Sequence, residues 1–201
     1  MAKYEELGRA IEESVRKASM GKEVAVAFSG GMDSGLVAAL AKKYARSVTC
    51  YTCGTDDSFD VQAGRELAEK LELPWVHCRI GEDTIENDIR ELIQATKVSD
   101  PFTISYELQL FTVCRKAHEP VVLSGQGSDE YFGGCASSVN DNDEEYEAVR
   151  NWGIERMMKV SMPCELSIAS HFKKRLCYPY LDEDVIRRVG EIDPAELRPT
   201  S

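Results

Sequence analysis

The sequence predicts an α/β fold, a doubly wound parallel sheet followed by a C-terminal helical appendage. Two observations predict it. Over residues 21–134, short apolar runs alternate with segments whose apolar residues recur at helical spacing, which is typical of crossover connections between parallel strands. Beyond Gly134 the alternation stops, and an acidic segment is followed by helical material. We therefore expect a single domain over residues 1–201, made of an N-terminal helix (1–20), an α/β core (21–134) and a helical appendage (135–201).

Each element follows from its local pattern. In the first 20 residues, apolar side chains recur at helical spacing, at Tyr4, Leu7, Ile11, Val15 and Ala18. Short apolar runs predict strands at residues 24–28, 47–53, 75–80 and 121–124. Helical composition predicts further helices at residues 35–45, 60–71, 85–93 and 102–117.

Composition excludes several classes of protein. The chain has 201 residues, 43% of them hydrophobic and 29% charged, which is ordinary for a globular protein with a real core. A net charge of −11 argues against a broad nucleic-acid surface. No apolar run approaches the roughly 20 residues of a membrane span, and the charged N-terminus does not resemble a signal peptide. We expect a cytoplasmic protein with no membrane association, whose seven scattered cysteines are reduced thiols.

The loop at residues 29–34, Ser-Gly-Gly-Met-Asp-Ser, follows the first expected strand and suits an anion. Gly30 and Gly31 allow consecutive backbone N–H groups to converge, and the following helix adds its positive end. Ser29 and Ser34 add hydroxyl donors, and Asp33 beside a phosphate implies Mg²⁺. The alternative is that Asp33 or Ser34 only caps the helix.

A second glycine-rich loop, residues 125–130, follows the fourth expected strand. Ligands of open parallel sheets bind beyond the carboxyl ends of the strands, where successive connections leave for opposite faces. If the strand order is 3-2-1-4, the two loops lie side by side at that point.

These motifs carry a family resemblance. "SGGMDSG" resembles the pyrophosphate loop of the N-type ATP pyrophosphatases, also called the PP-loop superfamily. "VVLSGQGSDEYFGG" and "YPYLDEDVI" resemble two signatures of its asparagine synthetase branch, and "GTDDSFD" lies where the family has a Gly-x-x-x-Ser-x-Asp loop. The resemblance runs from about Val24 to Val189 and implies a Rossmann-like, adenine nucleotide α-hydrolase-like sheet.

The resemblance also implies a function. The chain would be an ATP- and Mg²⁺-dependent ligase of amino-acid biosynthesis that cleaves ATP to AMP and pyrophosphate and activates a carboxylate as its adenylate for amide formation. Catalytic roles are implied for Asp33, which would also hold Mg²⁺, and for Asp129 and Glu130, whose alternative role is helix capping. The residues implied in binding ATP and pyrophosphate are Ser29, Gly30, Gly31, Asp33, Ser34, Cys53, Ser124 and Gly125.

Three departures from the family shape the expected reaction. The chain begins Met1-Ala2 and enters the synthetase region directly, so we expect it to lack the glutaminase domain and to take nitrogen from ammonia or a separate donor protein. Gln126 stands at the position of the family's glutamate, where a neutral amide cannot act as a base. We expect the chain to end before the family's phosphate-steadying lysine, for which Lys173 or Lys174 could substitute. A homodimer is compatible with the resemblance.

Two alternative functions stay open. Cys50, Cys53 or Cys135 could serve a sulfur-transferring member of the same superfamily, with a tRNA or a small molecule as the acceptor. Residues three apart in an extended strand point to opposite faces, so Cys50 and Cys53 converge only if the strand ends by Thr52. The other alternative is a nucleotide-binding subunit without turnover.

Overall fold

The computed structural model describes residues 2–134 and 143–197 of the chain. Its strands are β1 (Glu23–Ala27), β2 (Ser47–Gly54), β3 (Trp75–Arg79), β4 (Val121–Leu123) and β5 (Arg175–Cys177). Its α-helices up to β4 are α1 (Ala2–Ser19), α2 (Met32–Tyr44), α3 (Phe59–Lys70), α4 (Ile85–Thr96) and α5 (Pro101–Lys116). Those after β4 are α6 (Ser128–Tyr131), α7 (Asp143–Arg156), α8 (Met162–His171), α9 (Glu183–Gly190) and α10 (Pro194–Leu197).

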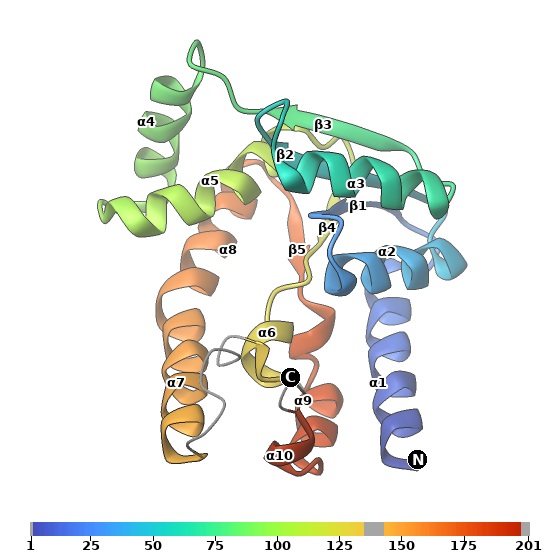
Figure 1. Ribbon diagram of the computed structural model, residues 1–201. Coiled ribbons are helices and arrows are strands. Elements are labelled where there is room, and N and C mark those ends of the chain that lie inside the picture. Colours follow the sequence, from blue (N-terminus) through green and yellow to red (C-terminus); the bar gives the residue numbers. More distant parts are fainter. Residues whose placement is uncertain (1, 135–142, 198–201) are drawn as a thin grey trace.

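The strands form one parallel sheet in the order β3-β2-β1-β4-β5 (Figure 1). The expected α/β fold class and the order 3-2-1-4 are confirmed. The fifth strand is a difference, because residues 175–177 lie in the segment expected to be helical. A three-residue strand is too short to show a period of two, so only its pairing with β4 reveals it.

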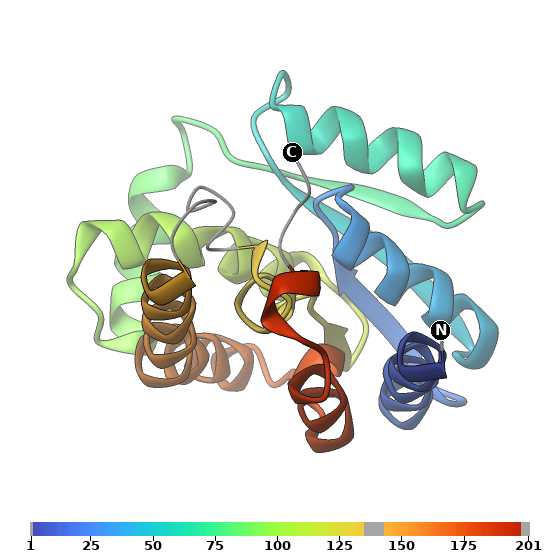
Figure 2. The ribbon, with the colours of Figure 1, turned by 60° about the horizontal axis from the view of Figure 1, so that its bottom comes forward.

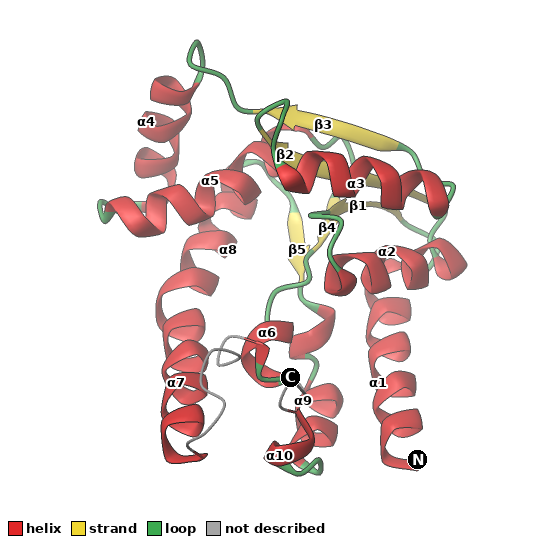
Figure 3. Ribbon diagram, in the orientation of Figure 1, coloured by secondary structure: helices red, strands yellow, loops and turns green. Residues whose placement is uncertain are grey.

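Helices cover both faces of the sheet, as the colouring of Figure 3 shows. In β1, Val24 and Val26 point into one apolar cluster and Ala25 points into the other, as alternation along a strand requires. The first cluster includes buried side chains of α1, α2 and α9, and α1 (dark blue in Figure 2) contacts both of the other helices. The second includes side chains of α4, α5 and α8.

The beginning of α5 is fixed by its own sequence. Asp100 is the N-cap, and its carboxylate accepts a hydrogen bond of 2.8 Å from the Thr103 backbone N–H, while Pro101 occupies the first turn. A π-helical turn, Met157–Ser161, joins α7 to α8 without a break in the helix. Among the helices in the described part of the chain, none is long and apolar enough to cross a membrane.

Candidate active site

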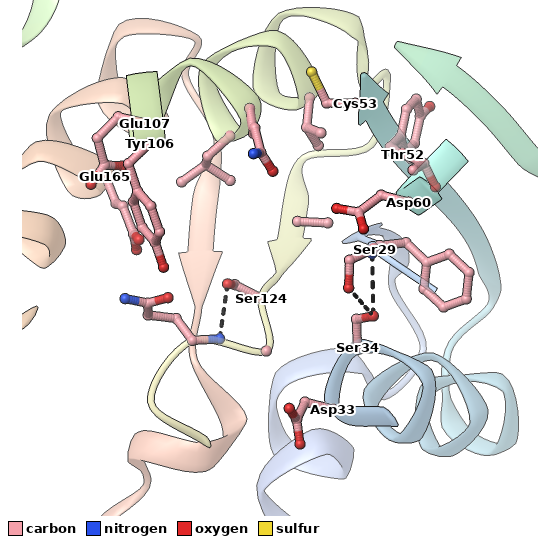
Figure 4. Close-up of a pocket in the computed structure, with 18 of the residues that line it drawn as sticks. Ser29, Asp33, Ser34, Thr52, Cys53, Asp60, Tyr106, Glu107, Ser124 and Glu165 are labelled. Carbon is pink, nitrogen blue, oxygen red and sulfur yellow. Dashed lines mark hydrogen bonds between the residues drawn. The ribbon is translucent and has the colours of Figure 1, made fainter. Parts of the chain in front are cut away.

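A cavity of about 250 Å³ opens at the carboxyl ends of β1 and β4 (Figure 4). Strand β1 leads through α2 to β2 on one side, whereas β4 lies on its other side, so this is the point where the connections diverge. The cavity is lined by both glycine-rich loops, by the end of β2 and by side chains of α5 and α8.

The first loop is held by its own serines. The Ser34 hydroxyl accepts from the Ser29 backbone N–H at 3.3 Å, and the Ser29 and Ser34 hydroxyls lie 3.2 Å apart. The Ser29 hydroxyl also accepts from the Gly31 N–H at 3.3 Å. The N-cap of α2 is Gly31, and no side chain caps the helix, so the interpretation of Asp33 or Ser34 as a mere cap is wrong. The first turn of α2 therefore keeps its capacity to bind an anion.

Gly30 is required by a close approach of two backbones. Its φ is +79°, and a Cβ at this position would lie 2.4 Å from the Gly64 backbone nitrogen of α3. Only glycine combines this conformation with this contact. The loop thus packs against α3 just before α2 begins, and this backbone contact fixes its shape.

The two glycine-rich loops meet. A Cβ on Gly125 would lie 3.3 Å from the Ser34 backbone nitrogen and 3.5 Å from Cβ of Asp33. The Tyr180 hydroxyl, from the segment "YPYLD", donates to the Asp33 carbonyl oxygen at 3.1 Å. The juxtaposition expected from the strand order is therefore present in the folded chain.

Asp33 and Asp129 place two carboxyl groups at this junction. Burial raises the pKa of Asp33, and the negative charge of Asp129 adds to the rise, while a hydrogen bond from Ser128 opposes it. Mg²⁺ is commonly held by one or two carboxylates together with phosphate oxygens. The donor set fits Mg²⁺ delivered with a phosphate ligand, because among the described residues no group of three or more His, Cys, Asp or Glu side chains could hold a metal ion alone.

The expected site residues divide into two groups. Those that line the cavity are Ser29, Asp33, Ser34, Cys53, Ser124, Gly125 and Asp129. Gly30, Gly31 and Glu130 are not among the lining residues. The first two shape the loop, and Glu130 is a half-buried residue of α6 whose carboxyl lies close to the Gly127 backbone amide. Gly127 is the N-cap of α6, so this contact agrees with the alternative role of Glu130 in helix capping.

Sequence reasoning missed part of the lining. Tyr106 and Glu107 of α5, Glu165 of α8 and Asp60 at the start of α3 all face the cavity. Asp60 was part of a recognised motif, "GTDDSFD". Glu107 and Glu165 could have been recognised in the sequence as acidic residues on otherwise apolar faces of their helices.

Cys50 and Cys53 do not form a reactive pair. Strand β2 continues to Gly54, so Cys50 packs in one core cluster and Cys53 in the opposite one. Burial raises the pKa of Cys50 to about 12 and that of Cys53 to about 11, which keeps both thiols protonated. Cys135 lies outside the described residues.

The suggestion that Lys173 or Lys174 replaces the family's lysine is wrong. Both residues precede β5, at the amino end of the strand, whereas the cavity lies at the carboxyl ends. The Lys174 ammonium donates to the carbonyl oxygens of Ala117 at 2.7 Å and Glu119 at 2.8 Å, just before β4.

Fold and cavity together define a doubly wound α/β protein with its candidate site at the carboxyl ends of the central strands. The family model described as asparagine synthase matches residues 6–157. The chain belongs to the asparagine synthase family.

Individual relatives agree with this membership. A putative glutamine-hydrolysing asparagine synthetase of Methanocaldococcus jannaschii is 32% identical over 91% of this chain and 36% of its own length. A glutamine-hydrolysing asparagine synthetase of Arabidopsis thaliana is 29% identical over 95% of this chain and 36% of its own. The chain thus spans 36% of the length of each of these two curated relatives.

Similarity to solved structures is more distant. A predicted subunit of a tRNA methyltransferase from M. jannaschii has a TM-score of 0.48 and 16% identity, covering 85% of this chain and 74% of its own. The NMN synthetase of Francisella tularensis has a TM-score of 0.45 and 14% identity, covering 100% of this chain and 96% of its own.

Proposed function

We propose that the chain is an ATP- and Mg²⁺-dependent, adenylate-forming synthetase of the asparagine synthetase type. In this reaction a carboxylate oxygen of the acceptor attacks the α-phosphorus of ATP, and the bond from that phosphorus to the bridging oxygen breaks. Pyrophosphate leaves. Ammonia or an amine then attacks the acyl carbon of the adenylate, and AMP departs with the carboxylate oxygen.

Each part of the cavity has a role in the proposal. The loop at residues 29–34 and the first turn of α2 bind the departing pyrophosphate. Asp33 and Asp129 would hold Mg²⁺, which would supply positive charge to neutralise the negative charge of the phosphates. The end of β2 at Cys53 and the pair Ser124-Gly125 border the nucleoside.

One observation carries the proposal: Gly125 of the second loop approaches the Ser34 backbone nitrogen of the first, beside two carboxyl groups. A helix N-terminus that no side chain caps favours an anionic partner, and two neighbouring carboxylates favour a cation. A metal-bound phosphate satisfies both preferences at once. ATP·Mg²⁺ is therefore the ligand whose charges fit this junction.

The test is the release of pyrophosphate from ATP·Mg²⁺ with a panel of amino-acid and other carboxylates, in the presence of ammonia. We expect release that depends on one acceptor, and we expect Asp33→Asn to lower it by about 100-fold or more. Glu66→Gln, on the exposed side of α3, is the matched control and should retain native activity. ADP and phosphate as products, or equal rates in native protein and Asp33→Asn, would contradict the proposal.

A further inference from the structure

The side of the cavity away from the glycine loops is acidic. Figure 4 shows Tyr106, Glu107 and Glu165 together on one side, with Ser29, Asp33 and Ser34 on the other. Glu107 comes from α5 and Glu165 from α8, which pack against each other. Gln126, which also lines the cavity, is neutral, so the charge here depends on the two glutamates.

Both glutamates are buried and incompletely satisfied. Glu107 is 1% exposed and Glu165 is 4% exposed. Among residues 2–134 and 143–197, no group forms a hydrogen bond with Oε1 of Glu107 or with Oε2 of Glu165. Buried carboxyl oxygens without partners are unfavourable, and two of them on the wall of one cavity could be satisfied together by a donor that enters from outside the chain.

The surrounding charges leave this pair uncompensated. Burial raises the pKa of Glu107 to about 8, and the charge of Glu165 adds to the rise. Burial also raises the pKa of Glu165 to about 7, with a further contribution from Glu130. The positive charge that acts on Glu107 is Arg156, whose guanidinium lies over the Phe102 ring at 4.9 Å from its centroid. The charge of Arg156 lowers the pKa of Glu107 by less than burial and the charge of Glu165 together raise it.

The other neighbours of the pair that the structure describes add hydrogen-bonding groups but no positive charge. The Ser161 side chain of the π-helical turn lies beside the Glu107 carboxyl, and the Tyr178 hydroxyl lies beside Glu165. Burial raises the pKa of Tyr106 to about 12, with contributions from the charges of Glu165 and Glu107, so its hydroxyl stays a neutral donor. A ligand with a positive charge and several N–H donors therefore matches what the pair lacks.

We propose that Glu107 and Glu165 bind a protonated amine, R–NH3⁺ or NH4⁺, at the acidic side of the cavity. The charge and the donors of an ammonium group would satisfy the two free oxygens together.

The role of this amine rests on the proposed function. If ATP occupies the glycine-loop side of the same cavity, the bound nitrogen belongs either to the amino group of the acceptor or to an ammonium ion, which passes a proton to a glutamate carboxylate and then attacks as ammonia. Both have the same chemistry, a protonated nitrogen seated within the cavity where the adenylate would form.

The experiment measures the thermal midpoint at pH 7.5 in methylammonium or ammonium chloride at about 100 mM, against sodium chloride of equal ionic strength. We expect an amine to raise Tm of the native chain by about 2–4 °C. We expect Glu107→Gln and Glu165→Gln to lose the rise and Glu66→Gln, exposed on α3, to keep it. Tetramethylammonium, which has charge but no N–H, should give none.

The outcomes separate the sources of the nitrogen. A rise with ammonium alone assigns the pair to the nitrogen donor, whereas a rise with methylammonium and with L-aspartate, but not N-acetyl-L-aspartate, assigns it to an acceptor's amino group. No rise with either amine in the native chain, or an equal rise in both glutamine variants, overturns the inference. A parallel titration with ATP·Mg²⁺ tests the proposed function separately, because the amine measurement uses no nucleotide.

Discussion

At Gly30 the absence of a side chain fixes the shape of the first glycine loop. A Cβ there would meet backbone atoms of α3, at 2.4 Å from Gly64 nitrogen and 2.5 Å from Ala63 carbon, and backbone cannot move aside as a side chain can. We expect Gly30→Ala to lower the free energy of unfolding by about 2–4 kcal/mol, measured by urea denaturation.

The matched control is Gly8→Ala. Gly8 lies within α1, and a Cβ there has nothing within 4 Å. Alanine should raise the free energy of unfolding by about 0.5–1 kcal/mol at that position. Equal effects of the two substitutions would show that Gly30 is not held against α3.

Glu107 and Glu165 make stability fall as the pH rises. Their pKa values, about 8 and about 7 in the folded chain, lie above the ordinary value of 4.5. The folded state thus binds protons more tightly than the unfolded state, and the free energy of unfolding decreases between about pH 4.5 and pH 8. We expect Glu107→Gln to be more stable than the native chain at pH 9, by about 2–4 kcal/mol, with a smaller gain at pH 5.

Urea unfolding at pH 5, 7 and 9 measures this difference. Glu66→Gln, which changes an exposed carboxylate, should follow the native curve at every pH. If the free energy of unfolding of Glu107→Gln varied with pH as that of the native chain does, burial would not raise the pKa of Glu107.

At the scale of an element, α5 positions the acidic side of the cavity and depends on its N-cap. The Asp100 carboxylate accepts hydrogen bonds from the backbone N–H and the hydroxyl of Thr103, each at 2.8 Å. We expect Asp100→Ala to lower Tm by about 2–4 °C, because the first turn of α5 loses its acceptor. Asp100→Asn retains an acceptor and should stay within about 1 °C of the native chain. An equal loss in both variants would assign the effect to charge and not to capping.

Elements differ in how far the sequence predicts them. Helices α3 and α5 carry long periodic patterns with clear start signals, and their expected bounds agree with the structure to within one or two residues. Strand β5 and the π-helical turn have no such pattern, because pairing and packing define them. The geometry of the Cys-x-x-Cys segment depended on one boundary: β2 runs past Thr52 to Gly54, and this sends Cys50 and Cys53 to opposite faces.

At the scale of the whole molecule, strand order decides where the site lies. Both glycine loops could be found in the sequence, since each follows an apolar strand, and the parallel order placed them side by side. The acidic side could not be found in this way. Glu107 and Glu165 are 58 residues apart, as their numbers give, and only the packing of α5 on α8 brings them to one cavity.

The proposed function depends on a metal-bound phosphate at the junction of the two loops. The most direct measurement is a calorimetric titration of ATP, with and without Mg²⁺, into the native chain and Asp33→Asn, with Glu66→Gln as the control. The native chain should bind ATP at least about 10-fold more tightly with Mg²⁺, because Asp33 and Asp129 repel the free triphosphate. Asp33→Asn should lose that gain and bind metal-free ATP more tightly than the native chain does. Two results would contradict the proposed function. One is an affinity of the native chain for ATP that does not change with Mg²⁺, and the other is an equal Mg²⁺ dependence in Asp33→Asn.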